Sequence, residues 1–517
     1  MPSMENKRIA KNTGMLYFRM LVTMFVKIYT SRVILNTLGV EDYGIYNVVG
    51  GLVAIFSILN TSMSAATSRF LIFELGKKNY AQLKKVFNAS LASHISISIV
   101  VLLVTETVGL WFLTNKLVIP EARMNAAMWA YQFSVFTTMI RLTQVPYTAV
   151  IIAHEKMKVY AYVSLLEVFL QLVIVYLLAL GGFDRLKFYA VLVFLVSLIN
   201  AMVYRLYCGK RYPEAKTSFH WDKELYKTLF TFSVWDLYGS IAIMGMGQGV
   251  NILLNMFFGP VVNAARGVAV SLQTAISGFG GNFMLASKPQ IVKLYAENKV
   301  DQMMKLVFAV SKYSFFLTLF LTLPVLLETE YILDLWLKTT PEYTVGFVRL
   351  VLINNLMMSL KSPIYTSFHA FGKIKMANLV CGSIYYLVII GSYICLKIGL
   401  PPESVFVVTI VVSFLEQVTE LFILKRLIDY SIAAYFKKVV LVVLIVTIIS
   451  GILPYLISVF FVPGPVRFLA TGALSAATVS AAVYFIGIDK ATRAFVVKTV
   501  KNLPQKITGK KHTASEL

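Results

Sequence analysis

The sequence predicts an all-α integral membrane protein. Hydrophobic residues make up 58% of the 517 residues and charged residues only 14%, whereas about a quarter of the residues in an average soluble protein are charged. The mean hydropathy is +0.74. Apolar runs of about 20 residues, the length that crosses a bilayer as a helix, recur along nearly the whole chain. No hydrophilic block between them is long enough for a soluble domain.

The loops predict the topology. We expect about fourteen spans joined by short loops. If the N-terminus is cytoplasmic, the alternate segments on that side hold most of the 48 Lys and Arg residues. Cytoplasmic loops are enriched in these residues, so we expect both termini in the cytoplasm. The same rule accounts for the net charge of +23, and we predict no nucleic-acid partner. The N-terminal KRIAK and its apolar span resemble a signal peptide, but the span is too long and too charged for one, so we expect it to be retained.

Two pairs of segments indicate an internal repeat. VILNTLG (33–39) aligns with ILLNMFFG (252–259) at an offset of 219 residues. PYTAVIIAHEKMK (146–158) aligns with PIYTSFHAFGKIK (363–375) at an offset of 217. An even number of spans separates the members of each pair, so the copies share one orientation. In transporters with parallel repeats the substrate path lies between the two copies.

The repeat predicts the domain organisation. It gives an N-terminal lobe at 1–215 (spans 1–6), a C-terminal lobe at 216–430 (spans 7–12), an appended span pair at 431–487 and a basic cytoplasmic tail at 488–517. No P-loop motif occurs, so we expect no ATP hydrolysis. The histidines lack the spacing of metal ligands, and the three cysteines form no C-x-x-C motif. We therefore predict no catalytic residue, no metal and no cofactor, and a secondary transporter instead of an enzyme.

Cations inside the spans are the strongest functional signal. An ionisable residue in a span is costly and usually faces the bundle interior or a water-filled cavity. The first span, RMLVTMFVKIYTSR (19–32), carries three. Arg suits phosphate through its planar fork of donors, so we expect a cationic cavity that accepts a phosphate-bearing substrate. Its predicted residues are Arg32, Arg69, Arg19, Lys27, Arg266 and Arg141. Arg32 shares a side with Arg19 and Lys27 only if the helix bends.

Acids inside the spans are the candidates for ion coupling. They are Asp236, Glu167, Glu416 and Glu420. Glu416 and Glu420 stand at i, i+4 on one helix face. They either pair with a cation such as Lys361 for structure, or one of them titrates and couples transport to protons. Asp236 begins a polar line on span 7 that continues through Ser240, Gly247 and Asn251.

The chain resembles the polysaccharide transporter family within the multidrug/oligosaccharidyl-lipid/polysaccharide exporter superfamily. The likeness rests on the charged first span, on LGVEDYGIYNVVGGL (38–52), on SAATSRF (64–70) and on the P…A…K-x-K ends of spans 4 and 10. It covers essentially the whole chain and looks closest to the O-antigen and capsule flippases of the bacterial inner membrane.

The resemblance implies fourteen helices in two lobes that alternate between inward- and outward-facing states. It implies a flippase for undecaprenyl-pyrophosphate-linked oligosaccharides that serves O-antigen (lipopolysaccharide), capsule or exopolysaccharide synthesis. The implied partners are that lipid-linked glycan, membrane lipids, protons or sodium as coupling ion, and other glycan-assembly membrane proteins.

Three alternatives stay open. The first is a multidrug-extrusion-type cation antiporter of the same superfamily, although three cations and no acid in the first span argue against the export of cationic drugs. The second is a membrane-embedded glycan polymerase or glycosyltransferase, with Glu41 and Asp42 as its acidic pair. We interpret that pair as a solvated turn between Gly39 and Gly44. The third is a scaffold beside glycan enzymes, which leaves the buried charges unexplained.

Overall fold

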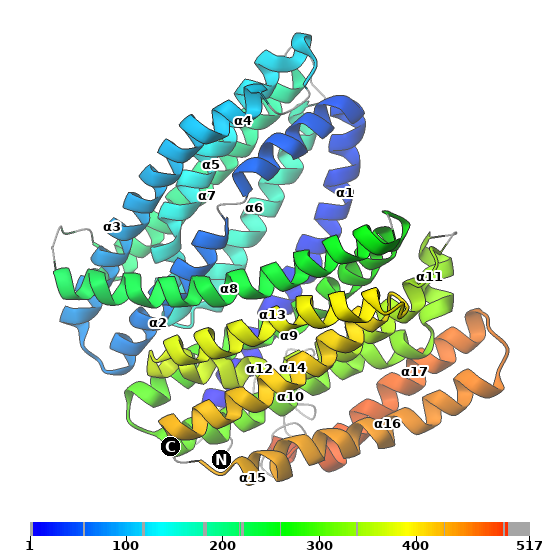
Figure 1. Ribbon diagram of the computed structural model, residues 1–517. Coiled ribbons are helices and arrows are strands. Elements are labelled where there is room, and N and C mark those ends of the chain that lie inside the picture. Colours follow the sequence, from blue (N-terminus) through cyan, green and yellow to red (C-terminus); the bar gives the residue numbers. More distant parts are fainter. Residues whose placement is uncertain are drawn as a thin grey trace, which may run out of the picture.

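The protein is an all-helical, multi-pass membrane protein, as the sequence predicted. A computed structural model describes residues 4–54, 57–115, 119–178, 184–216, 218, 222–258, 260–337, 340–428, 430–489 and 492–494. Among these residues there is no strand, and 11 helices are long and apolar enough to cross a membrane. Figure 1 shows the helices in two large groups with a helix pair on one flank.

The first group, which we call the N-bundle, contains the helices before residue 212. They are α1 (Met4–Ala54), α2 (Ser57–Gly76), α3 (Tyr80–Val104) with the π-turn Thr105–Gly109, α4 (Leu110–Asn115), α5 (Glu121–Ala153), α6 (Met157–Leu178) and α7 (Arg185–Arg211). A short 3-10 helix, Pro213–Ala215, leads to the second group.

The second group, the C-bundle, repeats this order of long helices. It contains α8 (Lys223–Phe258), α9 (Pro260–Ala296), α10 (Val300–Leu327), α11 (Thr329–Leu337), α12 (Thr344–Phe371), α13 (Ile374–Lys397) and α14 (Ser404–Leu427). After it come α15 (Ile432–Tyr435), α16 (Leu441–Phe460) and α17 (Pro465–Ala482), with π-turns at Phe436–Val440 and Val483–Gly487. The predicted boundaries at 215 and 430 lie between α7 and α8 and between α14 and α15. They stay predictions. Most of the predicted tail at 488–517 lies outside the described residues.

Glycine breaks the first helix where the sequence suggested a solvated turn. Gly39 has φ 82° and ψ 165° inside α1, a conformation that residues with a side chain rarely adopt. Asp42 is not simply solvated, because Arg123 of α5 donates to both of its carboxylate oxygens, at 2.8 and 2.6 Å. Arg123 also binds Asp184, the N-cap of α7. Burial opposes ionisation of Asp184, but the hydrogen bonds from Arg123 outweigh it and hold its pKa below the usual value.

The four turns at one end of the molecule repeat in pairs. Lys78 after α2 and Asn298 after α9 both have φ 57°. Glu155 after α5 has φ 56°, and Gly372 after α12 has φ 71°. The members of each pair stand about 220 residues apart, close to the offsets of the sequence repeat. The turn geometry therefore agrees with two copies of one arrangement.

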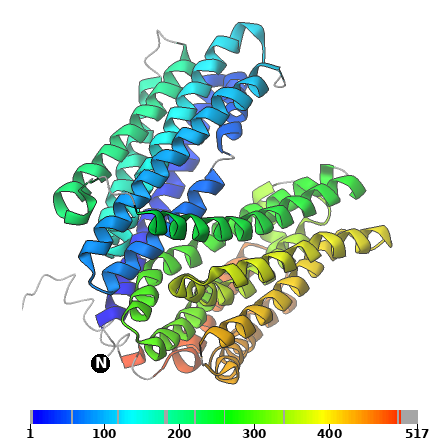
Figure 2. The same cartoon turned by 60° about the vertical axis from the view of Figure 1, so that its left-hand side comes forward.

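The two bundles meet at the end that carries these four turns, which we call the closed end. There Phe70 of α2 packs edge-on against Phe232 of α8, and Phe73 packs on Tyr295 of α9. A Cβ atom on Gly76 would lie only 2.8 Å from that of Ala296, so only glycine allows the helices this close. Toward the opposite, open end the bundles diverge, as both views show (Figures 1 and 2).

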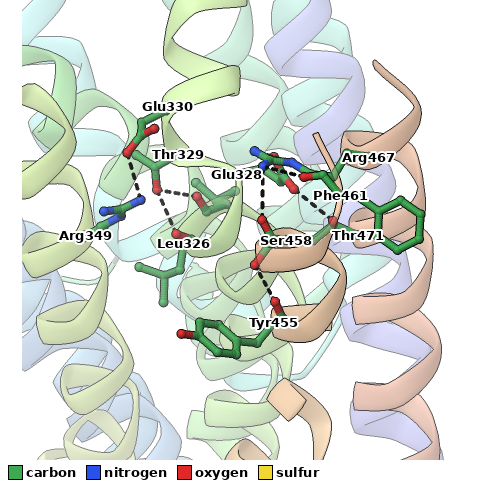
Figure 3. A network of polar contacts seen from close by, with 11 residues as sticks. Leu326, Glu328, Thr329, Glu330, Arg349, Tyr455, Ser458, Phe461, Arg467 and Thr471 are labelled. Carbon is green, nitrogen blue, oxygen red and sulfur yellow. Dashed lines mark hydrogen bonds and ion pairs between the residues drawn. The ribbon is translucent and has the colours of Figure 1, made fainter. Parts of the chain in front are cut away.

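A buried ion pair attaches the helix pair α16–α17 to the C-bundle (Figure 3). Glu328, directly after α10, accepts from Arg467 at 2.8 Å and from Thr471 at 2.9 Å, both on α17. Arg467 also donates to the carbonyls of Ser458 and Phe461 at the end of α16. One guanidinium thus joins three helices. Its side chain is 13% exposed and that of Glu328 only 1%.

We expect Arg467→Ala to destabilise the protein by about 3–5 kcal/mol, because Glu328 would stay buried without its cation. Thermal or denaturant unfolding in detergent measures this. Arg349→Ala is the matched control, since Arg349 and Glu330 form an ion pair nearby (Figure 3) whose side chains are 44% and 69% exposed. Pairs of that kind contribute about 0–1 kcal/mol. Equal effects of the two substitutions would contradict the role of Arg467.

Candidate functional site

One polar cluster lies within the N-bundle. Glu167 of α6 accepts from Asn200 of α7 at 3.2 Å and lies 3.8 Å from the guanidinium of Arg141 on α5. The side chain of Arg141 is 54% exposed. Two of the predicted site residues, Arg141 and Glu167, are therefore partners of each other.

Two more predicted cations lie at the junction of the bundles. Arg19 of α1 donates to Asn282 of α9 at 3.0 Å and lies over the ring of Tyr160. Arg69 of α2 donates to the carbonyls of His369 and Ala370 at the end of α12, at 2.9 and 3.3 Å. Both arginines join the two bundles, and Arg69 does so at the closed end.

Arg266 packs on the polar line predicted for α8. It donates to the carbonyl of Gly247 at 2.7 Å and to the side chain of Asn251 at 3.3 Å. The side chains of Lys27 and Arg32 lie outside the described residues, although the helix that carries them is described. The four described cations thus have protein partners at separate places, and these contacts do not gather them into one anion site.

The most deeply buried charges lie within the C-bundle. Lys361 of α12 forms an ion pair with Glu416 of α14 at 2.6 Å and donates to the hydroxyl of Tyr385 on α13 at 2.8 Å. Glu420, one turn after Glu416, interacts electrostatically with the same ammonium. Both glutamates are 0% exposed. The pairing of Lys361 with Glu416 that the sequence suggested is present.

This cluster has one positive charge too few. It brings two carboxylates and one ammonium together where no solvent reaches the carboxylates. Among the described residues, neither oxygen of Glu420 has a hydrogen-bond partner. An uncompensated carboxylate in a medium of low dielectric constant is strongly unfavourable. The cluster therefore favours the binding of one further cation, and the simplest such cation is a proton on a carboxylate.

A second buried acid, from α8, lies next to the same face of α12. Asp236 of α8 is 3.3 Å from the ring of His369 and 3.4 Å from the hydroxyl of Tyr365. Lys361, Tyr365 and His369 stand at i, i+4 and i+8, so they line one side of the helix. From the sequence, Lys361 was expected only as a partner of Glu416 or Glu420, and the histidines were noted only for lacking the spacing of metal ligands. The signal that identifies this face is the spacing of the three polar residues, which follow one another every four residues in an apolar span.

No group of three or more His, Cys, Asp or Glu side chains that suits a metal ion occurs in the part of the chain that the structure describes. The three cysteines are free thiols. The arrangement thus offers titratable carboxylates, an ammonium and an imidazole, a set suited to binding and releasing protons.

Comparison with known proteins identifies the fold. No protein-family model and no curated protein sequence matches the chain. Among solved structures, "MATE in the bent conformation" is similar with a TM-score of 0.69 at 12% identity, over 84% of this chain and 97% of that one. An outward-facing multidrug resistance MATE family transporter of the MOP superfamily matches with a TM-score of 0.66 at 13% identity, over 81% and 95% of the two chains. The MATE transporter ClbM in complex with Rb+ matches with 0.65 at 13%, over 83% and 96%.

These matches correct the main functional prediction. The prediction of an undecaprenyl-pyrophosphate-linked oligosaccharide flippase is wrong, because the similar structures are MATE proteins, one of them a multidrug resistance transporter, and they favour the multidrug alternative. The predicted lipid-linked glycan partner and the predicted role in O-antigen or lipopolysaccharide synthesis are therefore not supported either. The physical reason is that Arg19, Arg69 and Arg266 bind protein groups. Their presence in the spans therefore did not indicate an open site for an anionic substrate. The chain has the fold of the MATE transporters.

Proposed function

We propose that this protein is a multidrug-extrusion-type antiporter, which exports amphipathic organic molecules by alternating access in exchange for protons. The observation that carries the proposal is the excess negative charge of Lys361, Glu416 and Glu420 within the C-bundle. The MATE fold supports it, since two of the similar structures are MATE transporters.

A proton fits the C-bundle cluster better than a metal ion. Hard metal cations take about six or more oxygen ligands, whereas a proton needs one carboxylate oxygen. Lys361 already occupies Glu416 at 2.6 Å, so the free capacity is that of Glu420. An exchangeable proton there changes the net charge of the cluster between about −1 and 0, and this change is the means by which a gradient biases two conformations.

The closed end is assigned to the cytoplasm in this proposal. Its turns carry Lys77, Lys78, Lys156, Lys299 and Lys373, and cytoplasmic loops are rich in Lys and Arg. The conformation described is then outward-open, with the bundles joined on the inner side. Both chain termini belong on that side, and the membrane is a bacterial inner membrane.

Some exposed apolar side chains of α1 and α8 are of types that bind varied hydrophobic molecules. Phe25 on α1 is 65% exposed, and Met244 and Met256 on α8 are 52% and 70% exposed. Methionine adapts its shape and its sulfur contacts aromatic rings, so surfaces rich in it accept varied ligands.

We expect Glu420→Gln to abolish proton-driven export, because an amide can neither bind nor release the proton. The measurement is efflux of the dye ethidium by proteoliposomes with an imposed pH gradient. Glu330→Gln is the control, since Glu330 is an exposed acid at the open end and should transport as the unmodified protein does. Full transport by correctly folded Glu420→Gln would contradict the coupling role.

Alternating access also requires the closed end to open. With Gly76→Cys and Ala296→Cys, whose Cβ positions are 2.8 Å apart, a small shift reaches the Cβ separation of about 3.5–4.5 Å that a disulfide needs. We expect oxidation of the double variant to stop ethidium export and reduction to restore it. Each single variant is the control. Undiminished transport by the cross-linked protein would rule out opening at this place.

A further inference from the structure

One contact between the bundles is a cation on a helix end. Arg69 of α2 is 7% exposed and donates to the carbonyls of His369 and Ala370. The last carbonyls of a helix lack partners within it and carry partial negative charge. A Cβ atom on Gly372, the C-cap of α12, would come within 2.6 Å of this guanidinium. The fold therefore leaves room for Arg69 at the end of α12, and we call this contact the latch.

A buried acid–imidazole pair lies directly behind the latch. His369 lends its carbonyl to Arg69, while its ring Nε2 lies 3.3 Å from Asp236 on α8. Neither ring nitrogen has a hydrogen-bond partner among the described residues, so the imidazole is free to take up a proton beside the carboxylate. The side chains of His369 and Asp236 are 5% and 7% exposed. A residue that takes part in the latch is thus also a proton acceptor next to a carboxylate.

The ionisable groups around the pair come from three helices, α2, α9 and α12. Arg69 (α2) and Lys288 (α9) are the cations that face His369, and Lys288 also faces Asp236. Glu74 on α2 and Tyr295 on α9 interact with Arg69. Tyr365, on α12 itself, contacts Asp236. Two cations already surround the pair, so one more positive charge there repels both.

Polar groups connect the pair to the buried glutamates. The hydroxyl of Tyr365 donates to Asn378 of α13 at 2.9 Å and to Asp236 at 3.4 Å. One turn earlier, the ammonium of Lys361 lies 5.8 Å from the Tyr365 ring. Lys361 in turn pairs with Glu416. The side of α12 that carries Lys361, Tyr365 and His369 therefore extends from the proposed coupling site to the latch.

We propose that Asp236 and His369 form a second proton-binding site, and that a proton bound there releases Arg69 from the end of α12 and opens the closed end. This inference rests on the proposed antiport, since it assigns a gating role to the proton. The proton is held between the Asp236 oxygen and the His369 ring. The added positive charge weakens the contact of Arg69 with the helix end. A proton that arrives from the open side therefore favours the inward-open state, as an antiport cycle requires.

Distances between spin labels at the open end test the proposal. Ala122→Cys on α5 and Lys397→Cys on α13 place labels at exposed positions of the two bundles, in a background without Cys208, Cys381 and Cys395. When the latch opens, the open end closes and the distance shortens. We expect the short-distance population to rise about threefold or more from pH 8 to pH 5.5.

Variants then locate the proton. Asp236→Asn carries the charge of the protonated acid, so we expect a large short-distance population at both pH values. His369→Gln keeps the backbone carbonyl of the latch, so we expect a small short-distance population and no response to pH. Asp301→Asn is the control, because Asp301 is an exposed acid at the closed end. This variant should respond to pH as the unmodified protein does. Size-exclusion profiles verify that each variant is folded. If a variant aggregates, Tyr365→Phe replaces it, because this change removes only the hydroxyl beside Asp236. We expect Tyr365→Phe to weaken the response to pH.

The outcomes separate this inference from the proposed function. An unchanged pH response in both Asp236→Asn and His369→Gln overturns the second proton site, whatever Glu420→Gln does in transport. Normal ethidium export by Glu420→Gln overturns the coupling site, whereas a pH response that disappears in Asp236→Asn and His369→Gln still supports the second site.

Discussion

A charge buried inside a membrane bundle needs a partner, and this constraint determines where the polar residues of this protein lie. Glu328 meets Arg467, and Lys361 meets Glu416. Glu155 meets Gln290 and Lys293 across the seam between the bundles, at 2.6 and 2.5 Å. Each pair joins helices that are distant in sequence. Compensation of charge therefore also determines which helices stay together.

Glu420 is the exception within the C-bundle. Lys361 cannot neutralise Glu416 and Glu420 at once, so the cluster is stable only with a further cation or with one neutral carboxyl. A structural ion pair would have needed one acid. The second acid is the feature that distinguishes the cluster from a pair such as Glu328 and Arg467 and supports its role in transport.

The sequence predicted the fold well because the membrane imposes simple rules. Apolar runs, cation-rich loops and the repeat around Pro146 and Pro363 are local patterns, and they indicated the helical spans and a parallel repeat. The candidate site was harder. Sequence position placed Arg69 in a span, but only tertiary packing shows that it binds the end of α12, about 300 residues away. Counting cations therefore predicted an anionic substrate where the cations mainly join helices.

Some acids were identified correctly as neighbours and others only in part. The spacing of Glu416 and Glu420 placed them on one face, and Lys361 was named as their partner. The contact of Asp236 with His369 was not foreseen, because no local pattern encodes which side chains of α8 and α12 approach each other. The same limit applies to Asp42, whose partner Arg123 lies on another helix.

Infrared spectroscopy of the purified protein detects the proton assigned to Glu420, because the carbonyl stretch of a buried protonated carboxyl is distinct from that of a carboxylate. We expect such a band at neutral pH, its loss in Glu420→Gln, and its persistence in Glu330→Gln. A spectrum without a protonated carboxyl, or a band unaffected by Glu420→Gln, would contradict an exchangeable proton in the C-bundle.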